Sequence, residues 1–120
     1  MRRNFRNIKA WQRSDDMVML VYKKSRSFPR EELYGLTSQL RRAALSVPTN
    51  IAEGASRDFQ KEYLQFLNIA SGSISEVEYL LHVSKRLNYL NEKDYFEIEI
   101  ARKEAAKLLH GLIVSVKNDK

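Results

Sequence analysis

The chain has 120 residues, with 21 Lys and Arg against 15 Asp and Glu, a net charge of +6, two His and no Cys. This length predicts one domain over residues 1–120, with one modest core and no separate cofactor domain. The lack of Cys excludes a disulfide scaffold, a zinc ribbon and an iron–sulfur site. No apolar run approaches the ~20 residues of a membrane span, and none of the kind found in a secretory signal follows the basic start. We therefore expect a cytoplasmic protein without membrane contact.

Apolar residues recur along the chain at spacings of three and four, and alternating strand patterns are absent. This pattern predicts helices at about 7–26, 31–54, 59–87 and 92–116. Pro29 separates the first helix from the second, Gly54 ends the second, and Asn91 can cap the fourth. Loops this short make sequential helices antiparallel neighbours. The sequence therefore predicts an all-α fold, an up-down left-handed four-helix bundle.

The positive charge is concentrated in the first quarter of the chain. Residues 1–30 hold nine basic and two acidic side chains, a net of +7, and the other 90 residues have a net of −1. The first predicted helix carries basic residues spaced four, three and four apart, namely Arg2, Arg6, Lys9 and Arg13. If this helix extends back to its start, they share an arc of about 60°. Such a stripe is typical of a phosphate-binding face, and an ordinary solvated face is the alternative.

The second predicted helix contains a proline in its interior. Pro48 removes the hydrogen bond to the carbonyl of Ala44 and should kink the helix there. Thr49 and Asn50 could satisfy backbone groups that the kink frees. Four charged residues lie in or just after this helix, namely Arg41, Arg42, Glu53 and Arg57. They predict either salt bridges between helices or subunits, or a nucleic-acid site.

The third predicted helix is apolar over a wider arc than one seam needs. Five large residues flank its main stripe, namely Leu64, Leu67, Ile69, Leu80 and Leu87. A wide core face explains them, and so does a subunit interface. Gly72 in the middle of this helix costs about 1 kcal/mol relative to Ala. We expect the close approach of a neighbouring helix to offset that cost.

Motifs for catalysis are missing from the sequence. Neither His82 nor His110 stands in the Glu-x-x-His motif of a di-iron bundle. Neither lies beside a plausible nucleophile that it could activate. We therefore expect a protein that is not an enzyme and that holds no cofactor and no metal.

Three segments carry a resemblance to a bacterial family, namely Phe28 to Ala44, Asn50-Ile51-Ala52-Glu53-Gly54, and Phe66 to Ser73. Over nearly the whole chain, the sequence resembles the four-helix-bundle proteins of the 23S rRNA intervening-sequence family. This family is similar in fold to the accessory variability determinant of diversity-generating retroelements, a basic pentameric barrel that binds nucleic acid and its reverse transcriptase. The resemblance implies an up-down bundle that assembles as a ring, a homopentamer.

Together these observations predict a non-enzymatic, oligomeric bundle that binds RNA or DNA through a basic first helix. The candidate binding residues are Arg2, Arg3, Arg6, Lys9, Arg13, Lys23, Lys24, Arg41, Arg42 and Arg57. Two alternatives stay open. One is a scaffold that docks a protein partner such as a polymerase, and the other is a structural ring without a ligand.

Overall fold

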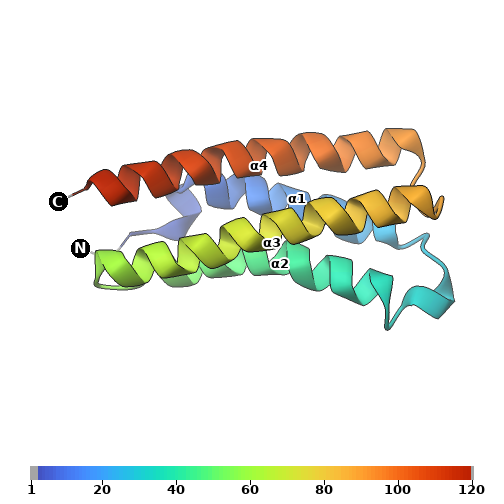
Figure 1. The fold of residues 1–120 in the computed structure, drawn as a ribbon, viewed down its shortest axis with the longest axis horizontal. Coiled ribbons are helices and arrows are strands. Elements are labelled where there is room, and N and C mark those ends of the chain that lie inside the picture. The colour runs from blue at the N-terminus through green and yellow to red at the C-terminus, as the bar shows by residue number, and fades with distance from the viewer. Residues whose placement is uncertain (1–2, 120) are drawn as a thin grey trace.

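The computed structural model describes residues 3–119 and shows four long helices among them. The helices are α1 (Lys9–Ser25), α2 (Leu36–Ala55), α3 (Gln60–Arg86) and α4 (Glu92–Asn118). They run alternately up and down, so that the two described ends of the chain lie at the same end of the bundle (Figure 1). α1 packs against α2 and α4, and α3 packs against the same two helices. The predicted all-α bundle is therefore confirmed.

Two helices begin later than the sequence pattern predicted. The first begins at Lys9, because Ile8 is extended, with φ −85° and ψ 118°, and separates α1 from a 3-10 turn, η1 (Phe5–Asn7). The second begins at Leu36, because Arg30–Glu32 forms a separate 3-10 turn, η2, and Gly35 interrupts the helical backbone with ψ −113°. A carboxylate oxygen of Glu32 accepts a hydrogen bond from the backbone N–H of Leu36 at 3.2 Å and so closes the first turn of α2.

The core runs along the axis between the four helices. Its largest side chains with under 2% exposure come from every helix and include Met17, Leu40, Ile51, Tyr63, Leu67, Leu81, Ile98 and Leu109. The wide apolar arc of α3 is divided between core and surface. Leu67 and Leu80 are buried, whereas Ile69 and Leu87 are 53% and 48% exposed. Part of this arc therefore faces the core, and part is free to meet another surface.

The close helix approach predicted for Gly72 occurs at Gly54 instead. A Cβ at Gly54 would lie 2.9 Å from Cδ1 of Tyr63 and 2.9 Å from Cβ of Phe66, where α2 meets α3. A Cβ at Gly72 would meet nothing within 4 Å. The prediction for Gly72 was wrong for the single chain, because its position on α3 faces away from the described helices.

α2 continues through Pro48, which is buried. Asn50 donates from Nδ2 to the carbonyl of Ser46 at 2.8 Å and to its Oγ at 3.0 Å. The side chain of Asn50 therefore binds the carbonyl two residues before the proline, and not the carbonyl of Ala44 that the proline leaves free. Oγ of Ser46 lies 2.8 Å from Oγ of Ser73, so the same group of side chains joins α2 to α3.

Candidate nucleic-acid interface

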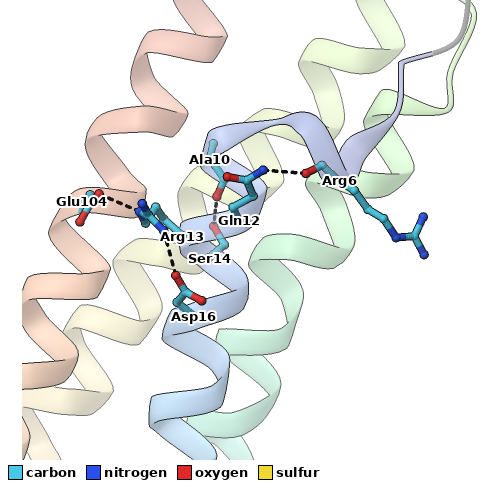
Figure 2. Close-up of polar contacts among 7 residues, drawn as sticks. All are labelled: Arg6, Ala10, Gln12, Arg13, Ser14, Asp16 and Glu104. Carbon is cyan, nitrogen blue, oxygen red and sulfur yellow. Dashed lines mark hydrogen bonds and ion pairs between the residues drawn. The ribbon is translucent and has the colours of Figure 1, made fainter.

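The structure divides the basic stripe that the sequence predicted along the first helix. Arg6 lies in η1, before the break at Ile8, and Arg13 lies on α1. Gln12 donates from Nε2 to the carbonyl of Arg6 at 2.8 Å and holds η1 against α1. Figure 2 shows the Arg6 side chain pointing away from α1, while Arg13 points toward α4. The prediction of one continuous stripe was therefore wrong, and Arg2 lies outside the described residues.

Arg13 is held by two carboxylates. Its Nε lies 2.8 Å from Oε1 of Glu104 on α4, and its Nη1 lies 3.1 Å from Oδ2 of Asp16 on α1 (Figure 2). The hydrogen bond to Glu104, and then that to Asp16, raise the pKa of Arg13 above its usual value. Because two negative groups already neutralise it, Arg13 adds little positive potential for a phosphate.

Lys24 is neutralised in the same way at the other end of α1. Its Nζ lies 3.0 Å from Oδ1 of Asp94 and 3.3 Å from Oε1 of Glu97, both on α4. The hydrogen bond to Asp94 is the main cause that raises the pKa of Lys24. Arg13 and Lys24 therefore connect α1 to α4. Lys9 and Lys23 also lie on α1, but they are exposed and form no ion pair with any residue of 3–119.

Arg3 and Arg57 lie together over one turn of α3. Cζ of Arg3 is 4.2 Å from the ring centroid of Tyr63, and Cζ of Arg57 is 4.7 Å from that of Phe66. Nη1 of Arg3 donates to the backbone carbonyl of Arg57 at 3.3 Å. Burial raises the pKa of the Tyr63 hydroxyl, and the charge of Arg3 partly opposes this change. The N-terminal segment thus meets the turn between α2 and α3.

Arg6 also stacks on an aromatic ring. Its Cζ is 4.6 Å from the centroid of Phe5, which in turn packs edge-on against Trp11 at 4.9 Å between centroids. We call Arg3, Arg6 and Arg57 the terminal arginine cluster. All three side chains are exposed, and none forms an ion pair with a carboxylate of residues 3–119.

The remaining two candidates lie on α2, far from this cluster. Arg41 donates from Nε to Oγ of Ser25 at 2.8 Å and stacks over Tyr22 at 4.8 Å. Arg42 is exposed and lines a pocket of about 620 Å³ beside Glu76. Neither arginine forms a salt bridge with Glu53 in the described part of the chain.

A buried ion pair on α4 escaped the sequence reasoning. Glu99 and Arg102 are only 7% and 6% exposed, and Nη2 of Arg102 also lies 3.5 Å from Oε2 of the exposed Glu78 on α3. Hydrogen bonding to Glu99 raises the pKa of Arg102. The sequence offered one signal for this pair, because opposite charges three residues apart on a helix can form an ion pair. It was missed because both residues border the apolar seam, where charge is rarely buried.

Residues 3–119 offer neither a membrane span nor a metal centre. No helix there has both the length and the apolar character to cross a membrane. No group of three or more His, Cys, Asp or Glu side chains there is arranged to hold a metal ion.

The fold and its surface define a small up-down four-helix bundle with cationic groups at its ends. The model of the 23S rRNA-intervening sequence protein family matches residues 6–111, and the chain belongs to this family. The family predicted from the sequence is therefore confirmed.

The fold is similar to that of a crystallised protein of unknown function from the S23 ribosomal protein family of Bacteroides thetaiotaomicron. The TM-score is 0.80 at 24% identity, and the match covers 87% of this chain and 97% of the other. At this identity the likeness supports the fold alone. A comparison with curated proteins finds no match.

Proposed function

We propose that this protein is a non-enzymatic, homo-oligomeric nucleic-acid-binding protein that contacts phosphates through the terminal arginine cluster. The proposal depends mainly on the contrast between two groups of cations. Arg13 and Lys24 each have two carboxylate partners, whereas Arg3, Arg6 and Arg57 have aromatic rings beneath them and no carboxylate partner within residues 3–119. Phosphate oxygens are the natural partners for guanidinium groups left in this state.

Stacking prepares these side chains for a polyanion. A guanidinium over a ring keeps its charge and loses some rotamer freedom before binding, so less entropy is lost when it meets a phosphate. Docking then releases counterions from the nucleic acid, which makes the affinity dependent on salt. Contacts of this kind position a strand and carry little base specificity. Phe59, 68% exposed in the same turn as Arg57, offers a ring on which an unpaired base can stack.

The outer faces of α3 and α4 support the oligomeric part of the proposal. Ile69 and Tyr79 on α3 are 53% and 64% exposed, and Phe96 and Ile100 on α4 are 52% and 66% exposed. Gly72 shares the face of Ile69 and Tyr79, where its missing side chain leaves room for another helix. A second copy of the chain would cover these apolar groups. The resemblance to the accessory variability determinant implies five copies in a ring, which would repeat the arginine cluster five times.

The binding proposal is tested by two double variants that remove the same charge. Fluorescence anisotropy with structured RNA and with duplex DNA, at several salt concentrations, would compare R3Q/R57Q with R13Q/K24Q. We expect R3Q/R57Q to flatten the slope of log affinity against log salt by about 0.9 for each phosphate that the variant no longer neutralises. We expect R13Q/K24Q to keep the wild-type slope. Equal slopes for both variants, or no binding by the wild type at low salt, would overturn the proposal.

The oligomeric state is tested separately by light scattering after size exclusion. We expect the wild type to be one multi-subunit species and Ile69→Glu to release folded monomers. Met19→Glu serves as the control, because Met19 is similarly exposed, at 59%, but lies on α1. A monomeric wild type at micromolar concentration would contradict this part of the proposal. A protein partner that survives nuclease treatment in a pull-down would favour the scaffold function instead.

A further inference from the structure

The chain passes from α1 to α2 at the end of the bundle opposite its N- and C-terminal ends (Figure 1). A second group of arginines lines a pocket at this connection. The pocket has a volume of about 360 Å³, and its lining includes Arg26, Arg30 and Arg41. The 17 residues of α1 separate it from the terminal arginine cluster. At 1.5 Å per residue this is roughly 25 Å, so one small ligand cannot reach both groups.

The charge of this pocket is uncompensated. Arg26 and Arg30 are exposed and form no ion pair within residues 3–119, and no carboxylate lines the pocket. Arg41 is fixed from two sides, since its Nε donates to Ser25 and its guanidinium stacks over Tyr22. This arrangement leaves both terminal nitrogens of Arg41 available to a ligand.

The two acids nearest to this pocket along the chain are Glu31 and Glu32, and Glu32 has other partners. One carboxylate oxygen of Glu32 accepts from the backbone N–H of Leu36 at 3.2 Å, and the other accepts from the hydroxyl of Tyr89 at 3.0 Å. Glu32 is therefore engaged in closing α2 and in joining this connection to the turn between α3 and α4. Neither glutamate forms an ion pair with the three arginines of the pocket within residues 3–119, which leaves these arginines for an external anion.

A buried hydroxyl in the pocket wall points independently to a ligand. Thr37 lines the pocket and is 3% exposed, and its Oγ1 is the one buried side-chain polar atom without a hydrogen-bond partner in residues 3–119. Buried hydroxyls in folded proteins are nearly always paired. Thr37 belongs to the first turn of α2, whose dipole favours a negative group and whose Leu36 N–H is capped by Glu32.

We propose that this pocket binds a phosphate monoester. Arg26, Arg30 and Arg41 match the three terminal oxygens and the charge of nearly −2 that a monoester carries at neutral pH, whereas a diester offers two such oxygens and one charge. The Thr37 hydroxyl, buried in the pocket wall without a partner in residues 3–119, donates to the same group once its side chain turns toward the ligand. The apolar side chains of Phe28 and Leu33, which also line the pocket, cover the organic part of the ligand. The site is separate from the terminal arginine cluster and does not depend on the function proposed for it.

Isothermal titration calorimetry with inorganic phosphate and with AMP tests this site directly. We expect saturable binding of both to the wild type, tighter for AMP, and no binding of adenosine. R26Q/R30Q should weaken AMP binding at least tenfold, and Thr37→Val about tenfold. R13Q/K24Q removes the same charge as R26Q/R30Q at residues outside the pocket and should bind as the wild type does.

Two results would overturn the proposal. One is the absence of saturable binding of phosphate and AMP at millimolar concentrations, and the other is equal weakening by R26Q/R30Q and R13Q/K24Q. The source of the phosphate is decided by an oligonucleotide with a 5′-phosphate and its 5′-hydroxyl counterpart. Preference for the phosphorylated strand over AMP assigns the pocket to a strand end, and preference for AMP assigns it to a free nucleotide. The R3Q/R57Q variant should leave AMP binding unchanged, which separates this result from the binding at the other end.

Discussion

Arg102 and Glu99 form a two-point ion pair inside the bundle, with Nε 2.5 Å from Oε2 and Nη2 3.1 Å from Oε1. Both residues lie on α4, one turn apart, and face the packed side of that helix. Each supplies the partner that the other needs in a place where an unpaired charge is strongly unfavourable. Single and double substitutions of this pair should therefore have very different effects on the free energy of unfolding.

We expect Glu99→Ala to lower the free energy of unfolding by about 3 kcal/mol, because it leaves the guanidinium of Arg102 buried with only the solvated Glu78 nearby. The double variant E99L/R102M should lie close to the wild type, because it removes both charges and keeps apolar volume. Urea unfolding followed by circular dichroism measures both. Glu78→Ala is the control, with an effect below about 1 kcal/mol, since the Glu78 side chain is 59% exposed. A double variant as unstable as E99A would contradict this account.

Alanine substitutions at Gly54 and at Gly111 should change the stability of the protein in opposite directions. Gly54→Ala places a Cβ 2.9 Å from Tyr63 and Phe66 and 3.3 Å from the Tyr63 carbonyl, so α2 and α3 must separate. We expect a loss of about 1–3 kcal/mol from this overpacking. Gly111→Ala lies within α4 with nothing within 4 Å of the new Cβ and should gain up to about 1 kcal/mol from helix propensity. Thermal unfolding of the two variants checks the sign of each change.

Thr37→Val should stabilise the protein in the absence of any ligand. The substitution keeps the shape of the side chain and removes a buried hydroxyl that has no partner in the described chain, a group that costs about 1–3 kcal/mol. Thr49→Val on the exposed face of α2 is the control and should change little. Unfolding in phosphate-free buffer measures the difference. A destabilised T37V would show that the hydroxyl has a partner in solution.

Stability should fall at alkaline pH through Tyr63, which is buried, and Tyr95, which is half-buried. Burial raises the pKa of Tyr63 and of Tyr95 in the folded state above the value of about 10 in the unfolded chain. The folded protein then holds its protons where the unfolded chain has lost them. The contribution is therefore complete below pH 10 and is lost as the pH rises through the folded-state pKa values.

Urea unfolding at pH 8 and at pH 11 tests the alkaline loss of stability. Tyr63→Phe removes one of the titrating groups and should make that loss smaller. The matched control is Tyr79→Phe on the same helix, where the phenol is 64% exposed, and it should follow the wild type. An alkaline loss that Y63F leaves unchanged would exclude Tyr63 as its source.

The spacing of apolar residues and the residues that begin or end helices were sufficient to predict the bundle. Spacings of three and four place Leu40, Val47 and Ile51 on one side of α2, and all three are fully buried. Asn91 caps α4 as predicted, accepting from the N–H of Asp94 at 2.7 Å. These features are local, because a cap or a seam depends on residues within a turn or two of one another. The helix starts at Lys9 and Leu36 were missed because 3-10 turns use the same residue types as a first helical turn.

The sequence by itself determined how many cations this protein carries near its N-terminus. The spacing of its apolar residues determined that these cations lie on or beside a helical bundle. Only the tertiary structure decided which of them are free. Arg13 meets Glu104 across 91 residues of chain, and Arg3 meets the backbone of Arg57 across 54. Pairing of this kind depends on which helix faces come together. The periodic pattern along one segment does not predict these contacts between distant segments. The arginines at the two ends of the bundle stay without carboxylate partners within residues 3–119, whereas α4 supplies carboxylates to Arg13 and Lys24 on α1.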